Sequence, residues 1–255
     1  MPTPLSRVAI ITGASRKAGI GQAIARRLAQ AGNAVFITYY RPYDHESGLA
    51  KDEGEAEALL AELRREGHTA AGLELDLSDP AAPPRLFDAV EAALGPASIL
   101  VNNATHSMPD GILNLTAELL DRTYALNLRG MALLCAEFVR RHLAGSPGRI
   151  INMSSGQGVG PMPGELAYVA TKGAVEAFTL SLSAEVARLG ITVNAVDPGI
   201  TDTGWISAEL NAQWTASSPF GRVGAPDDAA RLIAFLASEE ARWITGQVIH
   251  SRGGL

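Results

Sequence analysis

The sequence predicts an α/β fold: a doubly wound parallel sheet of about seven strands with helices on both faces, forming a single domain. Short runs of apolar and β-branched residues alternate with helical periodicities from one end of the 255-residue chain to the other. These runs are continuously apolar, which is typical of strands buried on both faces of a parallel sheet. We therefore expect one core over residues 1–255 rather than two domains.

The expected elements follow in chain order. Seven apolar runs are expected to be strands: Arg7–Thr12, Ala34–Tyr39, Gly72–Asp76, Ser98–Asn102, Arg149–Ser154, Ile191–Val196 and Gln247–His250. Five stretches with apolar residues at helical spacing are expected to be helices: Ile20–Ala31, Glu53–Glu66, Leu115–Leu143, Leu166–Leu189 and Asp227–Ser238. The least regular segments are Arg41–Asp52 and Thr201–Pro219.

The segment Thr201–Pro219 interrupts the alternation just after an expected strand and contains Trp205 and Trp214. In doubly wound sheets, ligands bind beyond the carboxyl ends of the strands. We therefore expect residues 201–219 to form a substrate lid, and the two tryptophans suggest an apolar or ring-containing ligand. The alternative is a surface excursion that packs its own tryptophans.

The composition argues against several kinds of function. Lys and Arg number 21 against 27 Asp and Glu, without a dense basic stretch, so neither nucleic acid nor a membrane is an expected partner. The single cysteine, Cys135, excludes an intrachain disulfide, and the histidines show no metal-ligand spacing, so no metal is expected. No apolar run reaches 18 residues and the N-terminus lacks a signal-peptide layout, so we expect a soluble cytoplasmic protein.

A glycine-rich turn follows the first expected strand and leads directly into a helix. It contains Gly13, Gly19 and Gly21. Glycines let the backbone approach a pyrophosphate, and the free N–H groups of the helix N-terminus stabilise its charge. The position predicts a dinucleotide site, with a plain βα turn as the alternative.

The end of the second expected strand indicates which dinucleotide is bound. An NAD site usually carries Asp or Glu there, to hold the ribose hydroxyls. Here no acid occurs before Asp44, and Arg41 follows the strand. Arg41, together with Arg16 or Lys17 of the turn, is expected to pair with a 2′-phosphate, unless these cations are simply solvated surface charges. The sequence therefore favours NADPH, with NAD possible.

Tyr168 and Lys172 lie four residues apart on an expected helix, so they share a face. A nearby ammonium group favours the phenolate, and we expect it to lower the pKa of Tyr168 from about 10 towards a range useful for a general acid or base. Ser155 ends the fifth expected strand, where its hydroxyl would hold a substrate carbonyl oxygen beside the phenol. An ordinary exposed helix face is the alternative explanation of the Tyr/Lys pair.

Together, these motifs resemble those of the short-chain dehydrogenase/reductase family, in order over about 240 residues. In chain order they are TGASRKAGIG (12–21), DLSD (76–79), NNA (102–104), Asn127, Ser155, YVATK (168–172), PGITDT (198–203) and ITGQVIHSRGG (244–254). Within the family, the stretches ITVNAVDPGITDT, PFGRVGAPDDAA and ITGQVIH are similar to those of the 3-oxoacyl-acyl-carrier-protein reductase group.

The resemblance implies a Rossmann-type fold and a catalytic set of Asn127, Ser155, Tyr168 and Lys172. Tyr168 would protonate a carbonyl while NADPH delivers hydride to its carbon. Ser155 would orient the substrate oxygen. Lys172 would hold the nicotinamide ribose and acidify Tyr168, and Asn127 would hold a water that resupplies the proton.

The resemblance also implies the cofactor contacts. Asp76 and the amide of Leu77 would contact adenine, Asn102 and Ala104 would line the ribose and phosphate path, and the Ile200 backbone would hold the carboxamide. The full expected set is Gly13, Ser15, Arg16, Lys17, Gly19, Ile20, Gly21, Arg41, Asp76, Leu77, Asn103, Ala104, Tyr168, Lys172, Pro198, Gly199, Ile200 and Thr203.

The chain departs from the family pattern at two places. Five residues separate Gly13 from Gly19 where the family usually has three, and Thr105 replaces the glycine of the family's NNAG. Enoyl reductases of the same superfamily also have longer loops, but their tyrosine and lysine are seven residues apart. His106 follows Thr105 and is interpreted as a polar loop residue, with a proton donor as the alternative.

Three functions remain open at this point. The first is NADPH-dependent reduction of a carbonyl, in a 3-oxoacyl thioester or a similar ketone. The second is oxidation of a sugar, steroid or other secondary alcohol by an NAD(P)-dependent alcohol dehydrogenase, and the third is a non-catalytic nucleotide-binding protein. The resemblance also implies a homodimer or homotetramer in which Leu115–Leu143 and Leu166–Leu189 pair between subunits; both stretches are unusually rich in Ala and Leu for exposed helices. Substrate specificity is expected in Met108–Leu113, Gln157–Glu165 and the lid.

Overall fold

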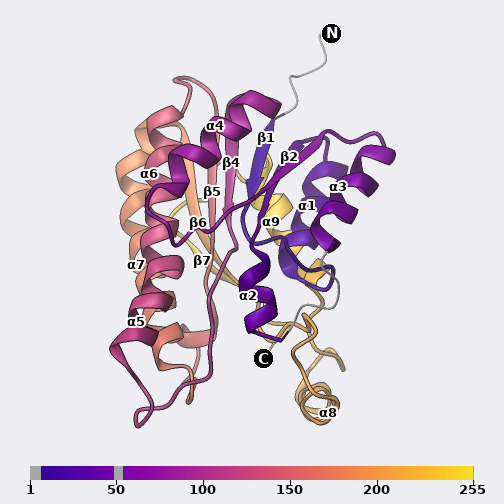
Figure 1. Cartoon of the computed structure of the whole chain (residues 1–255), viewed down its shortest axis with the longest axis vertical. Helices are drawn as coiled ribbons and strands as arrows, with labels where there is room; N and C mark the ends of the chain where they lie inside the picture. The colour runs from indigo at the N-terminus through magenta and orange to yellow at the C-terminus, as the bar shows by residue number, and fades with distance from the viewer. Residues whose placement is uncertain (1–6, 49–53, 255) are drawn as a thin grey trace.

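The computed structural model describes residues 7–48 and 54–254 and confirms the predicted fold class, a single Rossmann-type α/β domain (Figure 1). The strands are β1 (Val8–Ile11), β2 (Ala34–Tyr39), β3 (Ala70–Glu74), β4 (Ala97–Asn102), β5 (Gly148–Met153), β6 (Ile191–Asp197) and β7 (Val248–His250). All neighbouring strands pair in parallel, in the order β3-β2-β1-β4-β5-β6-β7.

Helices lie against both faces of the sheet (Figure 1). They are α1 (Ile20–Gln30), α2 (Arg41–Glu46), α3 (Glu55–Arg65), α4 (Ala82–Leu94), α5 (Ala117–Tyr124), α6 (Met131–Arg141), α7 (Leu166–Val186), α8 (Ala208–Ser217) and α9 (Pro226–Ala237). Shorter helical segments are η1 (Ala125–Gly130), η2 (Gly156–Gly158) and η3 (Ala187–Leu189). Over residues 7–48 and 54–254, no helix combines the length and the apolar character that crossing a membrane requires.

The core consists of two clusters, one on each face of the sheet. Ala9 and Ile11 pack with apolar residues of α1, α3 and α9, whereas Val8 and Ile10 pack with those of α4, α6 and α7. Successive side chains of a strand point to opposite faces, so a strand covered on both sides is apolar at most positions; buried polar exceptions such as Arg149 and Asn152 of β5 have hydrogen-bond partners. This is the physical reason for the uninterrupted apolar runs in the sequence.

Three helices were not predicted. Residues 82–94 form α4, although Pro83 and Pro84 interrupt the apolar pattern at its start; proline is tolerated in the first turn of a helix. The described part of Arg41–Asp52 contains α2, and Thr201–Pro219 contains α8. The expected helix starting at Glu53 begins at Glu55, and Glu53 itself lies outside the described residues.

Parallel pairing brings the carboxyl ends of the strands to one edge of the sheet. Ile11 of β1 pairs with Val101 of β4, and Asn102 of β4 pairs with Asn152 of β5. Asn152 in turn pairs with Ala195 of β6. The loops that follow β1, β4, β5 and β6 therefore meet at this edge, although they are far apart in the sequence.

Gly130 provides a test of this packing. At the end of η1, an added Cβ would lie 2.4 Å from the carbonyl oxygen of Leu77, a backbone atom that cannot move aside cheaply. Gly130→Ala should lower the free energy of unfolding by about 1–3 kcal/mol, the usual effect of overpacking. Urea denaturation measures this. At Gly111 an added Cβ has no neighbour within 4 Å, so Gly111→Ala is the control. Equal stability of the two variants would contradict the packing described.

Candidate active site

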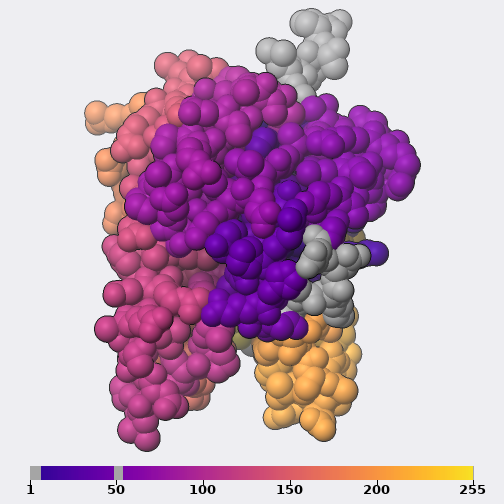
Figure 2. Space-filling model, in the orientation of Figure 1, coloured from indigo at the N-terminus to yellow at the C-terminus, as the bar shows by residue number. Residues whose placement is uncertain are grey.

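A cavity of about 1260 Å³ lies at the carboxyl edge of the sheet. Its walls come from the loops after β1, β4, β5 and β6, from the start of α7, and from α2 and α8. Figure 2 shows α8 as a separate projection at one end of the molecule, with a hollow beside it. Sixteen of the predicted site residues line the cavity: Gly13, Ser15, Arg16, Gly19, Ile20, Gly21, Asp76, Leu77, Asn103, Ala104, Ser155, Tyr168, Pro198, Gly199, Ile200 and Thr203.

The glycine turn is held against the loop after β4. Gly13 has a φ of +69°, and a Cβ there would lie 2.6 Å from Ala104 Cα, so only glycine fits. Asn103 Nδ2 donates to the carbonyl oxygens of Thr12 and Gly13, each at 2.9 Å. The backbone amides of Asn103 and Ala104 both donate to Thr12 Oγ1 at 2.9 Å. These contacts close the turn over the start of α1.

The N-terminus of α1 is suited to a bound anion. Neither a side-chain cap nor an acidic residue occurs in its described first turn. Free N–H groups and the positive end of the helix dipole therefore face the cavity. Gly21 packs so closely that a Cβ would lie 2.5 Å from the Gly13 carbonyl oxygen. The turn thus has the shape and polarity that a pyrophosphate needs.

Of the three cations predicted to meet a 2′-phosphate, only Arg16 lines the cavity in the described structure. Arg16 donates to the Thr203 carbonyl oxygen at 3.0 Å and pairs with Asp44 at 3.3 Å. Lys17 is exposed outside the cavity. Arg41 is turned away from it by salt bridges to Glu57 and, at 3.1 Å, to Glu74. Contact between Arg41 and a 2′-phosphate therefore stays a prediction that its present salt bridges do not support.

Asp44 and Asp76 sit on the same side of the cavity. Asp44 is buried, and burial raises its pKa, while hydrogen bonding from Ser15 and the charge of Arg16 oppose that rise. Asp76 accepts from the amide and hydroxyl of Ser78 at 2.8 and 2.7 Å. The sequence placed Asp76 at the cofactor, but nothing in it indicated that Asp44 would pair with Arg16.

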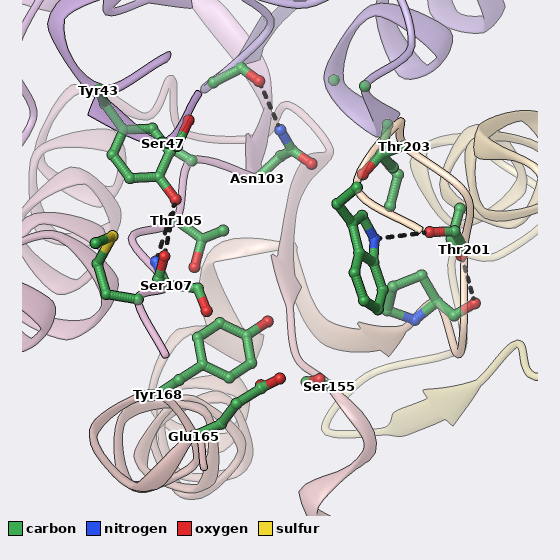
Figure 3. Close-up of a pocket in the computed structure, with 18 of the residues that line it drawn as sticks. Tyr43, Ser47, Asn103, Thr105, Ser107, Ser155, Glu165, Tyr168, Thr201 and Thr203 are labelled. Atoms are coloured by element: carbon green, nitrogen blue, oxygen red, sulfur yellow. Dashed lines mark hydrogen bonds between the residues drawn. The ribbon is translucent and has the colours of Figure 1, made fainter. Parts of the chain in front are cut away.

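The phenol of Tyr168 and the hydroxyl of Ser155 meet inside the cavity (Figure 3). Tyr168 stands in the first turn of α7, and Ser155 follows the end of β5 by two residues. Ser155 lies close enough to the phenol to lower the pKa of Tyr168, which favours the phenolate form. A proton donor and a second hydroxyl therefore converge on one point, where both can contact the same substrate oxygen.

Comparison with known proteins supplies the family. A family model described as "Enoyl-(Acyl carrier protein) reductase" matches residues 13–255. The "Uncharacterized oxidoreductase YjdA" of Bacillus subtilis is 50% identical over 250 residues, covering 97% of this chain and 96% of that protein. The "3-oxoacyl-[acyl-carrier-protein] reductase FabG" of Staphylococcus aureus is 35% identical over 254 residues, covering 98% of each.

Among solved structures, a short-chain dehydrogenase from Burkholderia cenocepacia J2315 in complex with NADP superposes with a TM-score of 0.86. Its sequence is 34% identical, and the match covers 99% of each of the two chains. The chain belongs to the short-chain dehydrogenase/reductase family. It is an NAD(P)-dependent oxidoreductase of that family.

The predicted effect of Lys172 on Tyr168 is wrong for this structure. The pKa of Tyr168 is raised to about 12 in total, and burial is the largest cause. The charges of Glu165 and Asp197 also raise this pKa, whereas Ser155 lowers it. Lys172 lies 5.4 Å from the Tyr168 ring centroid, but its amine donates to the Met153 carbonyl oxygen at 2.8 Å. Burial also lowers the pKa of Lys172 to about 8, so its amine gives up its proton far more easily than an exposed lysine does. Desolvation therefore outweighs the expected attraction between the two groups.

Asn127 is buried in η1 and does not line the cavity. Its Oδ1 accepts from the His106 amide at 2.7 Å and from Thr105 Oγ1 at 3.1 Å. Its Nδ2 donates to the His106 carbonyl oxygen at 2.9 Å and to Thr171 Oγ1 at 3.1 Å. Asn127 thus joins the loop after β4 to α7. His106 lies in a loop, as predicted, but its side chain is buried, and its Nε2 has no hydrogen-bond partner in the described part of the chain.

The segment after β6 forms the remaining wall of the cavity. Trp205 Nε1 donates to the Thr201 carbonyl oxygen at 3.2 Å, and the Trp205 and Trp214 rings lie 5.6 Å apart. Both tryptophans line the cavity. Because Arg16 holds the Thr203 carbonyl, the glycine turn and this segment are directly connected.

These residues fit a dinucleotide cofactor. The glycine turn leaves room for a pyrophosphate where any Cβ would collide with backbone, and the helix N-terminus faces it. Arg16 and the side chain of Asp76 stand on the side of β2 and β3, and Tyr168 and Ser155 stand at the other end of the same cavity. The cavity therefore accepts an elongated molecule that reaches from Asp76 to Tyr168 along the edge of the sheet.

The buried amine of Lys172 makes protein stability depend on pH. In the unfolded chain a lysine stays protonated up to about pH 10.5, whereas folded Lys172 loses its proton near pH 8. The burial penalty is therefore present below pH 8 and is relieved as the pH rises to about 10.5. Over that pH window, the free energy of unfolding of the wild type should rise by on the order of 3 kcal/mol relative to that of Lys172→Met.

Urea unfolding of both proteins at several pH values measures this difference. Lys17→Met, at an exposed lysine, is the matched control. If the difference in the free energy of unfolding between wild type and Lys172→Met does not change with pH, a buried amine with a lowered pKa is contradicted.

Proposed function

We propose that this enzyme reduces a ketone to a secondary alcohol with NADPH, using Tyr168 as the general acid. The observation that carries this proposal is the convergence of Tyr168 and Ser155 in the cavity that the glycine turn also lines. In this arrangement a carbonyl oxygen accepts hydrogen bonds from both hydroxyls, while its carbon faces the inner end of the cavity. When bound, the reduced nicotinamide supplies the hydride that adds to this carbon.

The residues of the chain supply position and a proton. Ser155 holds the carbonyl oxygen, and Tyr168 transfers its phenolic proton to that oxygen as negative charge develops there. The raised pKa of Tyr168 keeps the phenol protonated at neutral pH, which is the form that reduction needs. In this proposal Lys172 holds a ribose hydroxyl next to Tyr168; its amine bonds the Met153 carbonyl oxygen and does not itself line the cavity.

NADPH is proposed over NADH because Arg16 lines the cavity next to the end of β2, where Tyr40 stands in place of an acid. In this proposal Arg16 pairs with the 2′-phosphate, and Asp76 and Leu77 contact adenine. The Ile200 backbone and Thr203 contact the nicotinamide and pyrophosphate. The Burkholderia relative contains NADP, which supports the same choice.

The proposed substrate is a 3-oxoacyl thioester or a similar ketone, as the name of the Staphylococcus relative suggests. The family model carries the name of an enoyl reductase, but the four-residue spacing of Tyr168 and Lys172 and the position of Ser155 support carbonyl chemistry. Residues 201–219 are proposed as the lid, because Trp205 and Trp214 line the cavity next to α8.

We also propose that the enzyme is a homodimer or homotetramer. Leu120 and Tyr124 of α5 and Leu180 of α7 are exposed, although they are large apolar side chains. Association of these helices between subunits would cover them.

Replacing Tyr168 tests the proposed chemistry. Tyr168→Phe removes the proton donor but keeps the ring, so kcat for ketone reduction should fall by about 10²–10⁴-fold. The Kd for NADPH, measured by fluorescence titration, should change by less than about threefold. Tyr39→Phe is the control: Tyr39 also lines the cavity, but its hydroxyl donates to Glu57 Oε1 at 2.9 Å, so this variant should retain activity. Full activity of Tyr168→Phe would exclude the mechanism.

Replacing Arg16 tests the cofactor preference. Arg16→Ala removes the proposed partner of the 2′-phosphate, so the Kd for NADPH should rise about 10- to 100-fold while that for NADH changes little. Arg41→Ala and Lys17→Ala are controls, because neither side chain lines the cavity. Equal weakening of NADPH and NADH binding would mean that Arg16 only supports the loop.

A further inference from the structure

Glu165 stands immediately before α7, three residues before Tyr168, and lines the cavity. Figure 3 shows its side chain on the same side as Tyr168 and Ser155. The mechanism above does not use it. An acid in this position is normally explained by the helix N-terminus that it caps.

That structural explanation does not apply here, because another residue caps the helix. Asp110, from the loop after β4, accepts hydrogen bonds from the amides of Leu166 and Ala167 at 2.7 and 2.8 Å. Glu165 occupies the N-cap position but makes no side-chain cap hydrogen bond. Its carboxylate is therefore available to the cavity.

Glu165 also differs from the other carboxylates that line the cavity. Those are Asp44, Glu46, Asp76 and Asp110. Asp44 forms a salt bridge with Arg16, and Glu46 accepts two hydrogen bonds from Arg122, at 2.8 and 2.7 Å. Asp76 accepts from Ser78, and Asp110 accepts from the two amides at the start of α7. For the Glu165 carboxylate, the described residues provide no hydrogen-bond donor, and both burial and the charge of Asp110 raise its pKa.

The cations of the cavity wall are committed to other carboxylates. In the part of the wall that the structure describes, they are Arg16, which pairs with Asp44, and Arg252, whose Nη1 lies 3.0 Å from Asp197 Oδ2. Met162 and Pro163, which line the cavity just before Glu165 in the chain, have side chains that offer no hydrogen-bond donor. A half-buried carboxylate in such surroundings loses hydration unless a bound molecule offers a donor.

We propose that Glu165 is a specificity-determining residue that accepts a hydrogen bond from a hydroxyl group on the carbonyl substrate. The inference rests on the proposed function and narrows its substrate from 3-oxoacyl thioesters and similar ketones to uncharged hydroxyketones. A site that hydrogen-bonds a substrate hydroxyl rejects the analogue without it, because its own polar group is then left unpaired. A substrate with a carboxylate near the carbonyl is disfavoured by repulsion from Glu165 and Asp110.

Matched pairs of ketones test the proposal, each pair exchanging one hydroxyl for a methyl group of similar size. Suitable pairs are hydroxyacetone with butanone, acetoin with methyl isopropyl ketone, and diacetone alcohol with methyl neopentyl ketone. In wild type, kcat/KM should favour the hydroxyketone by about tenfold or more in at least one pair. In Glu165→Leu this ratio should fall to one or below, while kcat/KM for the alkyl ketone stays within about threefold.

Glu46→Leu is the matched control, because it removes a carboxylate from the same cavity that already has Arg122 as its partner. Its hydroxyketone preference should equal that of wild type. Glu165→Gln keeps an acceptor oxygen without the charge and should give an intermediate ratio; it replaces Glu165→Leu if the latter does not fold. The same ratio in wild type and in the Glu165 variant, or no hydroxyketone preference in any wild-type pair, overturns the proposal.

A binding measurement separates this inference from the proposed function. If the enzyme consumes NADPH with none of the ketones, ketone reduction is refuted. Glu165 is then tested by quenching of Trp205 and Trp214 fluorescence, with propylene glycol and with butan-2-ol as the probes. Wild type should bind the diol at least about tenfold more tightly than Glu165→Leu does. Equal affinities of the two proteins for the diol refute the role of Glu165.

Discussion

The site depends on parallel pairing of β1, β4, β5 and β6, which places the loops after these strands at one edge of the sheet. Asn103 makes this arrangement rigid. Its side chain bonds the backbone of Thr12 and Gly13, so the loop after β4 sets the shape of the turn after β1. An error in the pairing of β1 with β4 would move both the glycine turn and the wall opposite Tyr168.

Burial, rather than charge, dominates the chemistry of the reactive pair. Removing Tyr168 and Lys172 from water favours the neutral form of each, so the phenol stays protonated and the amine is easily deprotonated. A protonated phenol beside Ser155 is ready to donate. The same desolvation fixes Lys172 on the Met153 carbonyl, which ties α7 to the end of β5 and so sets the distance between Tyr168 and Ser155.

The two ends of the cavity differ in how their charges are balanced. At the end near β2, Arg16 and Asp44 neutralise each other and Arg16 also holds Thr203, so this end joins the glycine turn to the segment after β6. At the end near α7, Glu165 has no cationic partner among the described residues, because Arg252 faces Asp197. At the first end the charges of these described residues are balanced, whereas the second end is suited to an uncharged donor.

Local sequence determined the strands, the glycine turn and the four-residue spacing of Tyr168 and Lys172, because each depends on residues that are near neighbours in the chain. The position of Ser155 at the end of β5 followed from the same reasoning. Only the tertiary structure decided that Arg41 faces Glu57 and Glu74 instead of the cavity, since these carboxylates come from α3 and β3. It likewise decided that Asp110 caps α7 and leaves Glu165 to the cavity, since that contact joins residues 56 positions apart. Charge pairing and burial are set by neighbours in space, and the local pattern of a sequence carries little information about them.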